Sequence, residues 1–95
     1  MIRHVIFIKI GDKSKAEEIK STLESLPPQI PEIKRYDVGI NEIESDRACD
    51  VCIISEFDNY ETLKIYNDHP AHVKALGVIR QYATNVYAVD YTLPS

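Results

Sequence analysis

The chain has 95 residues, the length of one domain with a modest hydrophobic core. Its net charge of −4 and the scatter of its 11 basic residues exclude nucleic acid as the main partner, because phosphate binding requires clustered Lys and Arg. No apolar run approaches the roughly 20 residues that span a bilayer, and charged residues interrupt the apolar start of the chain, so we predict a cytoplasmic protein without a membrane segment.

The first predicted element is a strand over residues 2–10, which Gly11 and Asp12 end. Its side chains alternate between two faces, and both faces are mostly apolar. One face carries His4, Ile6, Ile8 and Ile10, and the other carries Val5 and Phe7. This pattern predicts that both sides of the strand are covered.

A helix over residues 14–26 is predicted next. Ser14 and Glu17 have the spacing of a capping box, in which the hydroxyl and the carboxylate each accept a backbone amide proton at the start of the helix. Pro27 and Pro28 end the helix because proline clashes with the preceding turn. The apolar stripe at helical spacing consists of Ala16, Ile19, Leu23 and Leu26.

Two further strands are predicted over residues 33–43 and 48–57, joined by a polar turn over residues 42–47. Cys49 and Cys52 have C-x-x-C spacing at the start of the later strand. A redox pair needs its first thiol at a helix start, and a metal site needs a second ligand pair that the chain does not offer at a suitable spacing. We therefore interpret both residues as free, buried or half-buried thiols that face opposite sides of the strand.

The last third of the chain predicts two helices and a strand. Asp58 and Glu61 have capping-box spacing and open a helix that carries Tyr60, Leu63 and Tyr66. Pro70 suits the first turn of a further helix, with His69 as its structural cap. That helix presents His72, Leu76 and Ile79 on one side, and residues 85–91 form the final strand.

The predicted order is strand, helix, strand, strand, helix, strand, which is the ferredoxin-like βαββαβ arrangement of the α+β class. Right-handed crossovers make the first and third strands central in a four-stranded antiparallel sheet with the helices on one face. The opposite face would then expose a large apolar patch, which soluble monomers rarely keep. We therefore predict a homodimer that packs sheet to sheet into an α/β barrel. The patch comprises Val5, Phe7, Cys52, Ile54, Tyr87, Val89 and Tyr91.

Over nearly its whole length, residues 1–95, the chain resembles the stress-responsive α/β-barrel (Dabb) domain family of dimeric α/β-barrel proteins. The most specific piece is the run Tyr66-Asn67-Asp68-His69-Pro70-Ala71-His72-Val73. The other pieces are the opening Ile2-Arg3-His4-Val5-Ile6-Phe7-Ile8-Lys9, the strand Tyr36-Asp37-Val38-Gly39-Ile40-Asn41, the segment Glu56-Phe57-Asp58 and the end Val89-Asp90-Tyr91. The resemblance implies a single-domain cytosolic dimer, some plant members of the family being stress-induced.

One branch of that family is similar to plant polyketide cyclases, which close an aromatic ring without a cofactor. The resemblance implies that His72 would act as the general base and that Tyr66 would orient or polarise the substrate. The same run also occurs in members without assigned chemistry, so it indicates the family better than the reaction. An imidazole at a helix start is kept neutral by the helix dipole, which suits a base. His72 could equally pack at the helix start against backbone, and Tyr66 could simply belong to the core.

Side-chain parity predicts a pocket between the sheet and the helices, with Tyr66 and His72 at its edge. Asp90 shares the inward face and could orient an imidazole or lie in water. The other residues expected to contact a ligand are His4, Ile6, Ile8, Ile53, Ser55, Phe57, Val73 and Leu76. We expect no metal and no cofactor, because no carboxylate cluster or ligand pair indicates one.

Three functional hypotheses follow. The first is a homodimer that binds a small apolar or aromatic molecule in this pocket. The second is a cofactor-free enzyme of the cyclase type, with proton transfer by His72. The third is a non-catalytic structural or interaction role in stress.

Overall fold

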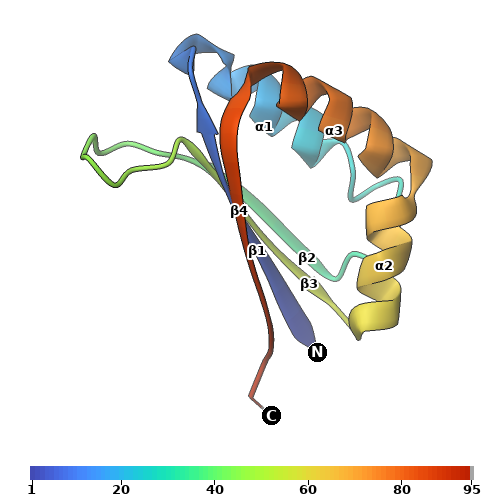
Figure 1. Ribbon diagram of the computed structural model, residues 1–95. Helices are drawn as coiled ribbons and strands as arrows, with labels where there is room; N and C mark the ends of the chain where they lie inside the picture. The colour runs from blue at the N-terminus through green and yellow to red at the C-terminus, as the bar shows by residue number, and fades with distance from the viewer. Residues whose placement is uncertain (95) are drawn as a thin grey trace.

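The computed structural model describes residues 1–94, and their strands and helices follow in the predicted order (Figure 1). The second and third strands are shorter than predicted, because the polar residues between them form a loop without strand structure. The elements are β1 Ile2–Ile10, a 3-10 turn η1 Lys13–Lys15, α1 Ala16–Glu24, β2 Arg35–Ile40, β3 Val51–Phe57, α2 Tyr60–Asp68, α3 Pro70–Tyr82 and β4 Ala83–Thr92.

The four strands form one antiparallel sheet in the order β2-β3-β1-β4. The predicted ferredoxin-like fold, with the first and third strands in the centre, is therefore confirmed. The register places Ser55 on one side of His4 and Asp90 on the other. Since directly paired residues point to the same face of a sheet, these three side chains share the face that the helices cover.

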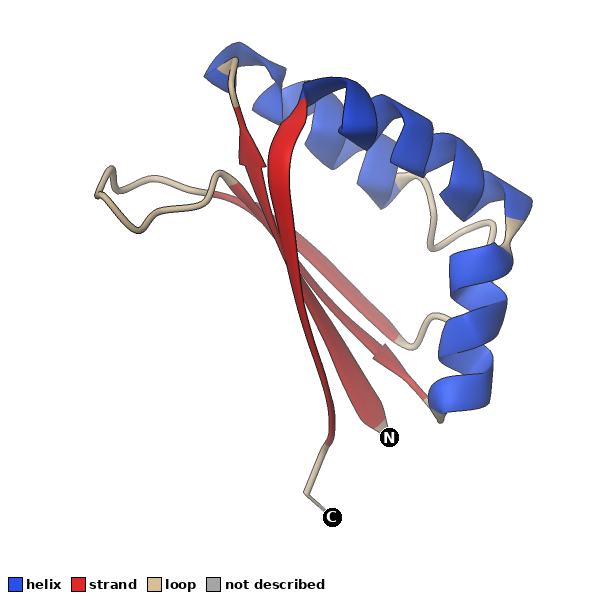
Figure 2. Ribbon diagram, in the orientation of Figure 1, coloured by secondary structure: helices blue, strands red, loops and turns tan. Residues whose placement is uncertain are grey.

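All three α-helices lie on one side of the sheet (Figure 2). Residues 1–94 contain no helix long and apolar enough to cross a membrane. The core forms where the helix stripes meet the inward face of the sheet. Its fully buried members include Ile8, Ile19, Leu23, Leu26, Ile30, Val51 and Phe57.

Two predicted capping boxes are wrong, and the structure shows a nearby residue in each place. The Asp12 side chain accepts a hydrogen bond from the Ser14 amide and caps η1, which precedes α1, so Ser14 does not cap the helix with Glu17. Asn59 caps α2 through a reciprocal pair of bonds with Thr62, in place of Asp58 with Glu61. Asp12 lies two residues before Ser14 and leaves α1 itself without a side-chain cap, whereas Asn59 directly follows Asp58 and caps α2.

The junction between α2 and α3 is a single residue, His69, whose extended backbone turns the chain sharply (Figure 1). The His69 Nδ1 atom accepts a hydrogen bond from the Ala71 amide at 3.0 Å. The predicted cap is therefore confirmed, with Pro70 as the first helical residue. This junction fixes His72 as the third residue of α3.

The second face of the sheet is uncovered in the single chain. Phe7, Tyr87, Val89 and Tyr91 are exposed on it, and Val5, Cys52 and Ile54 are half-buried. Cys49 precedes β3, so the strand alternation on which the prediction about the two thiols rested does not apply to it. Both free, half-buried cysteines border one shallow hollow beside Phe7.

Candidate functional site

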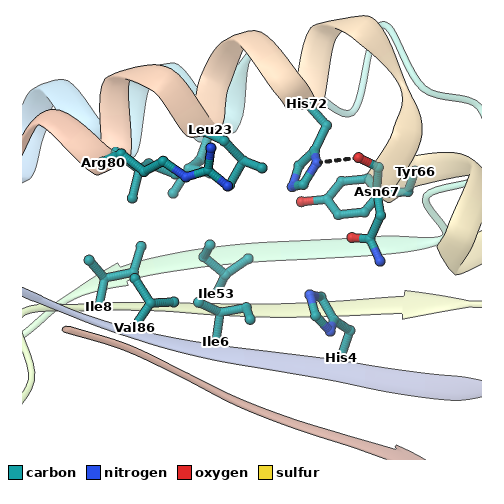
Figure 3. A pocket seen from close by; sticks show the side chains of 12 residues that line it. His4, Ile6, Ile8, Leu23, Ile53, Tyr66, Asn67, His72, Arg80 and Val86 are labelled. Atoms are coloured by element: carbon teal, nitrogen blue, oxygen red, sulfur yellow. Dashed lines mark hydrogen bonds between the residues drawn. The ribbon is translucent and has the colours of Figure 1, made fainter. Parts of the chain in front are cut away.

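A cavity of about 290 Å³ lies between the inward face of the sheet and the helices. Figure 3 shows isoleucines and His4 rising from the strands below, and His72, Tyr66 and Arg80 descending from the helices above. Most of its wall is apolar, and the polar groups are few, which is the usual composition of a small-molecule site. The lining residues are His4, Ile6, Ile8, Leu23, Ile53, Tyr66, Asn67, His72, Leu76, Ile79, Arg80 and Val86.

His72 is buried in the roof of the cavity, and its Nδ1 atom lies 3.0 Å from the backbone carbonyl oxygen of Asn67 (Figure 3). A carbonyl oxygen can only accept, so Nδ1 carries the proton and donates it to Asn67. In the neutral ring Nε2 then has a free lone pair. His72 thus combines the two roles that its sequence left open, because it bonds to backbone and also lines the cavity.

His4 occupies the floor of the cavity on β1, and its Nδ1 atom is hydrogen-bonded to Asp90 Oδ1 on β4. Asp90 is more exposed than His4 and is absent from the cavity wall. A carboxylate held on Nδ1 fixes both the tautomer and the orientation of the ring. Asp90 therefore does not line the cavity, but it can orient an imidazole that does, as its position on the inward face had suggested.

Tyr66 joins the two imidazoles into one aromatic group. Its ring centroid lies 4.3 Å from that of His72 and 6.3 Å from that of His4. Phe57 packs against its other side at 5.0 Å between centroids. The Tyr66 hydroxyl is 2.8 Å from the hydroxyl of Tyr36, so Tyr36 can donate to the Tyr66 oxygen and leave the Tyr66 proton available.

Burial sets the protonation states of this group. Desolvation lowers the pKa of His72 below its usual value of 6.5, and the backbone hydrogen bond from Nδ1 opposes this shift only partly. Desolvation also raises the pKa of Tyr66, so its phenol keeps its proton near neutral pH. The cavity therefore presents an unprotonated base and a hydroxyl donor within one cluster.

The structure brings together most, but not all, of the residues predicted to contact a ligand. His4, Ile6, Ile8, Ile53 and Leu76 line the cavity. Val73 does not, because its position on α3 faces solvent and leaves 55% of the residue exposed. The prediction that Val73 lines the pocket is therefore wrong.

Ser55 and Phe57 are also absent from the cavity wall, although their parity was assigned correctly. Both are fully buried on β3, where the strand passes beneath α2. The Ser55 hydroxyl donates to the backbone carbonyl of His4 at 3.1 Å, and Phe57 packs under Tyr66. They support His4 and Tyr66 from behind rather than contacting the cavity.

Five lining residues were not among the predicted ligand contacts: Leu23, Asn67, Ile79, Arg80 and Val86. Leu23 and Ile79 belong to the apolar stripes predicted for their helices, and Arg80 lies four residues after Leu76, so helical spacing could have indicated all three. Asn67 had no such signal, because it faces the cavity only through the break after α2. In the described part of the chain, no group of three or more His, Cys, Asp or Glu side chains is arranged to hold a metal ion.

Comparison with known proteins identifies the family. The stress responsive A/B barrel domain (Dabb) matches residues 2–93. The chain belongs to this family. An uncharacterised protein of Streptomyces coelicolor is 31% identical to this Dabb domain over 96% of the chain and 98% of its own length.

Solved structures agree with the fold of this Dabb domain. A dimeric protein of unknown function from Bacteroides fragilis, described as ferredoxin-like, is 28% identical over 97% of the chain and 95% of its own length, with a TM-score of 0.87. A hydroxynitrile lyase from Passiflora edulis is 17% identical over 98% and 96%, with a TM-score of 0.81. At that identity the likeness shows the shared fold alone.

Proposed function

We propose that this Dabb protein binds a small, largely apolar molecule in the cavity between the sheet and the helices. The observation that carries the proposal is the composition of the wall, where isoleucine and leucine side chains surround a cluster of His4, Tyr66 and His72. An apolar body would gain from leaving water. The free Nε2 atoms and the Tyr66 hydroxyl would orient one polar group of the ligand.

The size of the cavity limits the ligand. Its volume of about 290 Å³ lies just below the range of roughly 300–1,000 Å³ that is usual for ligand pockets. A molecule of one or two rings, or a short branched chain, fits such a space better than a long polyketide. This favours binding of a compact ligand over the cyclisation of an extended chain.

We also propose that the protein is a homodimer through the uncovered face of the sheet. The Bacteroides fragilis protein of the same fold is a dimer. Here Phe7, Tyr87, Val89 and Tyr91 form an exposed apolar face on the side of the sheet away from the cavity, and such a face is usually covered by a partner. Pairing of these faces would leave the two cavities on opposite sides of the dimer.

A cavity-filling variant tests the binding proposal. Leu76→Trp places an indole in the cavity wall, whereas Ile43→Trp adds the same group at a loop position that is 79% exposed. We expect the neutral probe indole to shift the amide resonances of cavity residues in the unmodified protein and in Ile43→Trp, but not in Leu76→Trp. Equal titration of all three proteins would show that indole binds elsewhere, and the proposal would fail.

A second candidate function is cofactor-free proton transfer of the cyclase type. It is favoured by one observation: the Nδ1 atom of His72 donates to the Asn67 carbonyl and burial lowers the pKa of the ring, so its Nε2 atom is left to accept a proton. His72 Nε2 would accept a proton from a carbon next to a carbonyl, and the Tyr66 hydroxyl would donate to the enolate oxygen. The proton would return from His72 to the product.

Deuterium exchange at the methylene group of benzoylacetone tests this candidate without knowledge of the natural substrate. We expect His72→Asn to lower the exchange rate at least tenfold, to a rate no higher than that given by an equal concentration of imidazole in solution. His69→Asn is the control, because asparagine preserves the helix cap and His69 lies outside the cavity. If the two variants exchange at the same rate, His72 is not the base.

A non-catalytic interaction role is the remaining alternative. It predicts neither indole binding in the cavity nor deuterium exchange that depends on His72.

The cytoplasmic location and the independence of metals and cofactors stay predictions from the sequence.

A further inference from the structure

Arg80 contributes a fixed positive charge to the wall of the cavity. No lining residue is Asp or Glu. Within residues 1–94, no carboxylate lies within ion-pairing distance of the Arg80 guanidinium. The other arginine side chains at the sheet, Arg3 and Arg35, are both paired with Glu56.

Arg80 lines the cavity from α3, although the residue as a whole is exposed to solvent. Helical side chains tilt toward the N-terminus of their helix, and His72 lies two turns before Arg80, about 12 Å along the axis at 1.5 Å per residue. Figure 3 shows the Arg80 side chain extending along the roof as far as Leu23, in the direction of His72 and above the isoleucines of the floor. The cavity therefore has a cationic end at Arg80 and a basic end at His72.

Electrostatics distinguish the ligands that such a cavity can take. A carboxylate that leaves water needs a cationic partner, because burial of an unpaired charge is costly. Arg80 supplies that partner and offers a planar set of donors that matches a carboxylate. A ligand ammonium group would instead be repelled, and the free lone pair of His72 Nε2 would repel a carboxylate from the other end. The charge of Arg80 reaches that end, because it adds to burial in lowering the pKa of His72.

We propose that the cavity selects small apolar carboxylic acids, with the carboxylate at Arg80, the apolar body over the isoleucines and the remaining functional group at His72 and Tyr66. This inference rests on the proposed binding function and adds to it the class and the orientation of the ligand.

The test uses matched probes of one shape: phenylacetate, the neutral phenylacetamide and the cationic phenethylammonium. Affinities come from amide chemical shifts at constant ionic strength. For the unmodified protein we expect phenylacetate to bind at least tenfold more tightly than phenylacetamide, and phenethylammonium to bind least well. Equal affinity for the acid and the amide would overturn the inference.

Two variants that remove one positive charge each from α3 separate recognition from net charge. Arg80→Gln should abolish the preference for phenylacetate without weakening phenylacetamide. Lys74→Gln is the control, because Lys74 is exposed and lies outside the cavity; this variant should keep the preference. Arg80→Lys should restore part of it as a point charge. An equal loss in Arg80→Gln and Lys74→Gln would mean that the acid responds to overall charge, and the inference would be wrong.

The outcomes also separate this inference from the function on which it rests. If indole and phenylacetamide bind in the cavity but the acid gains nothing, the cavity binds small molecules without selecting acids. If none of the probes, phenylacetate included, shifts the cavity resonances, both the binding function and the selection of acids are refuted.

Discussion

His72 is the residue whose chemistry depends most on its position in the fold. Its ring is buried beside Tyr66, and its Nδ1 proton is committed to the Asn67 carbonyl. Both constraints arise from the break at His69, which returns the start of α3 over the end of α2. A neutral imidazole with one free nitrogen is the result.

The lowered pKa of His72 predicts a pH dependence of stability. The unfolded chain binds this proton more readily than the folded protein does, so the folded state loses stability as the pH falls below about 6.5. The loss at this site cannot exceed about 1.4 kcal/mol per pH unit. Urea unfolding between pH 7.5 and 5.5 should show the free energy of unfolding decreasing with falling pH in the unmodified protein and in His69→Asn. The decrease should be smaller in His72→Asn. Identical slopes in all three proteins would contradict the assignment.

For single residues, the sequence predicted which face of the sheet a strand side chain points to better than it predicted the direction of a helical side chain. Alternation placed His4, Ile6 and Ile8 on the inward face, because a strand has only two faces. A helix has a continuous range of directions, so Val73, one residue after His72, faces solvent, while Arg80 reaches the cavity through a long side chain. The length and flexibility of arginine are not visible in an apolar pattern.

Among the elements, the strands and helices were predicted in type and order, whereas their ends were predicted less well. Apolar periodicity persists over a whole element, but a helix start depends on which of several adjacent polar side chains reaches the free amides first. Asp12 and Asn59 do so here, each close to the residue that was predicted.

The connection between β2 and β3 shows a second reason for such errors. Asp50 reads as a polar position at the start of a strand, yet it is buried. Its carboxylate accepts a hydrogen bond from the Ile10 amide at 2.8 Å and also contacts Lys13. Burial alone would raise the pKa of Asp50, but these bonds outweigh it and hold the pKa below its usual range. Contacts between residues that are distant in sequence, such as these, leave no local pattern.

For the whole molecule, the fold and the uncovered face followed from the sequence, since four strands with two apolar faces and helices for only one of them leave a face to cover. The position of the cavity between the sheet and the helices was also predicted, but its volume was not, because the volume depends on how far α3 stands from the sheet.

The homodimer makes a prediction at this scale. Val89 and Val73 are each 55% exposed, the first on the open face of the sheet and the second on a helix. We expect Val89→Lys to convert the dimer to monomer in sedimentation velocity experiments, because each dimer would bury two lysine charges. Val73→Lys should remain dimeric. A dimer that survives Val89→Lys would have to use another surface.

The pairing of β1 with β4 joins the two ends of the chain, with Ile2 opposite Thr92. His4 is therefore synthesised 86 residues before Asp90, which holds its ring. Contacts so far apart in sequence form slowly because a long loop must close before they can form. During synthesis, β1 must wait beside the ribosome with its apolar faces unpaired, which is the stage at which such a chain is most exposed to aggregation and to chaperones.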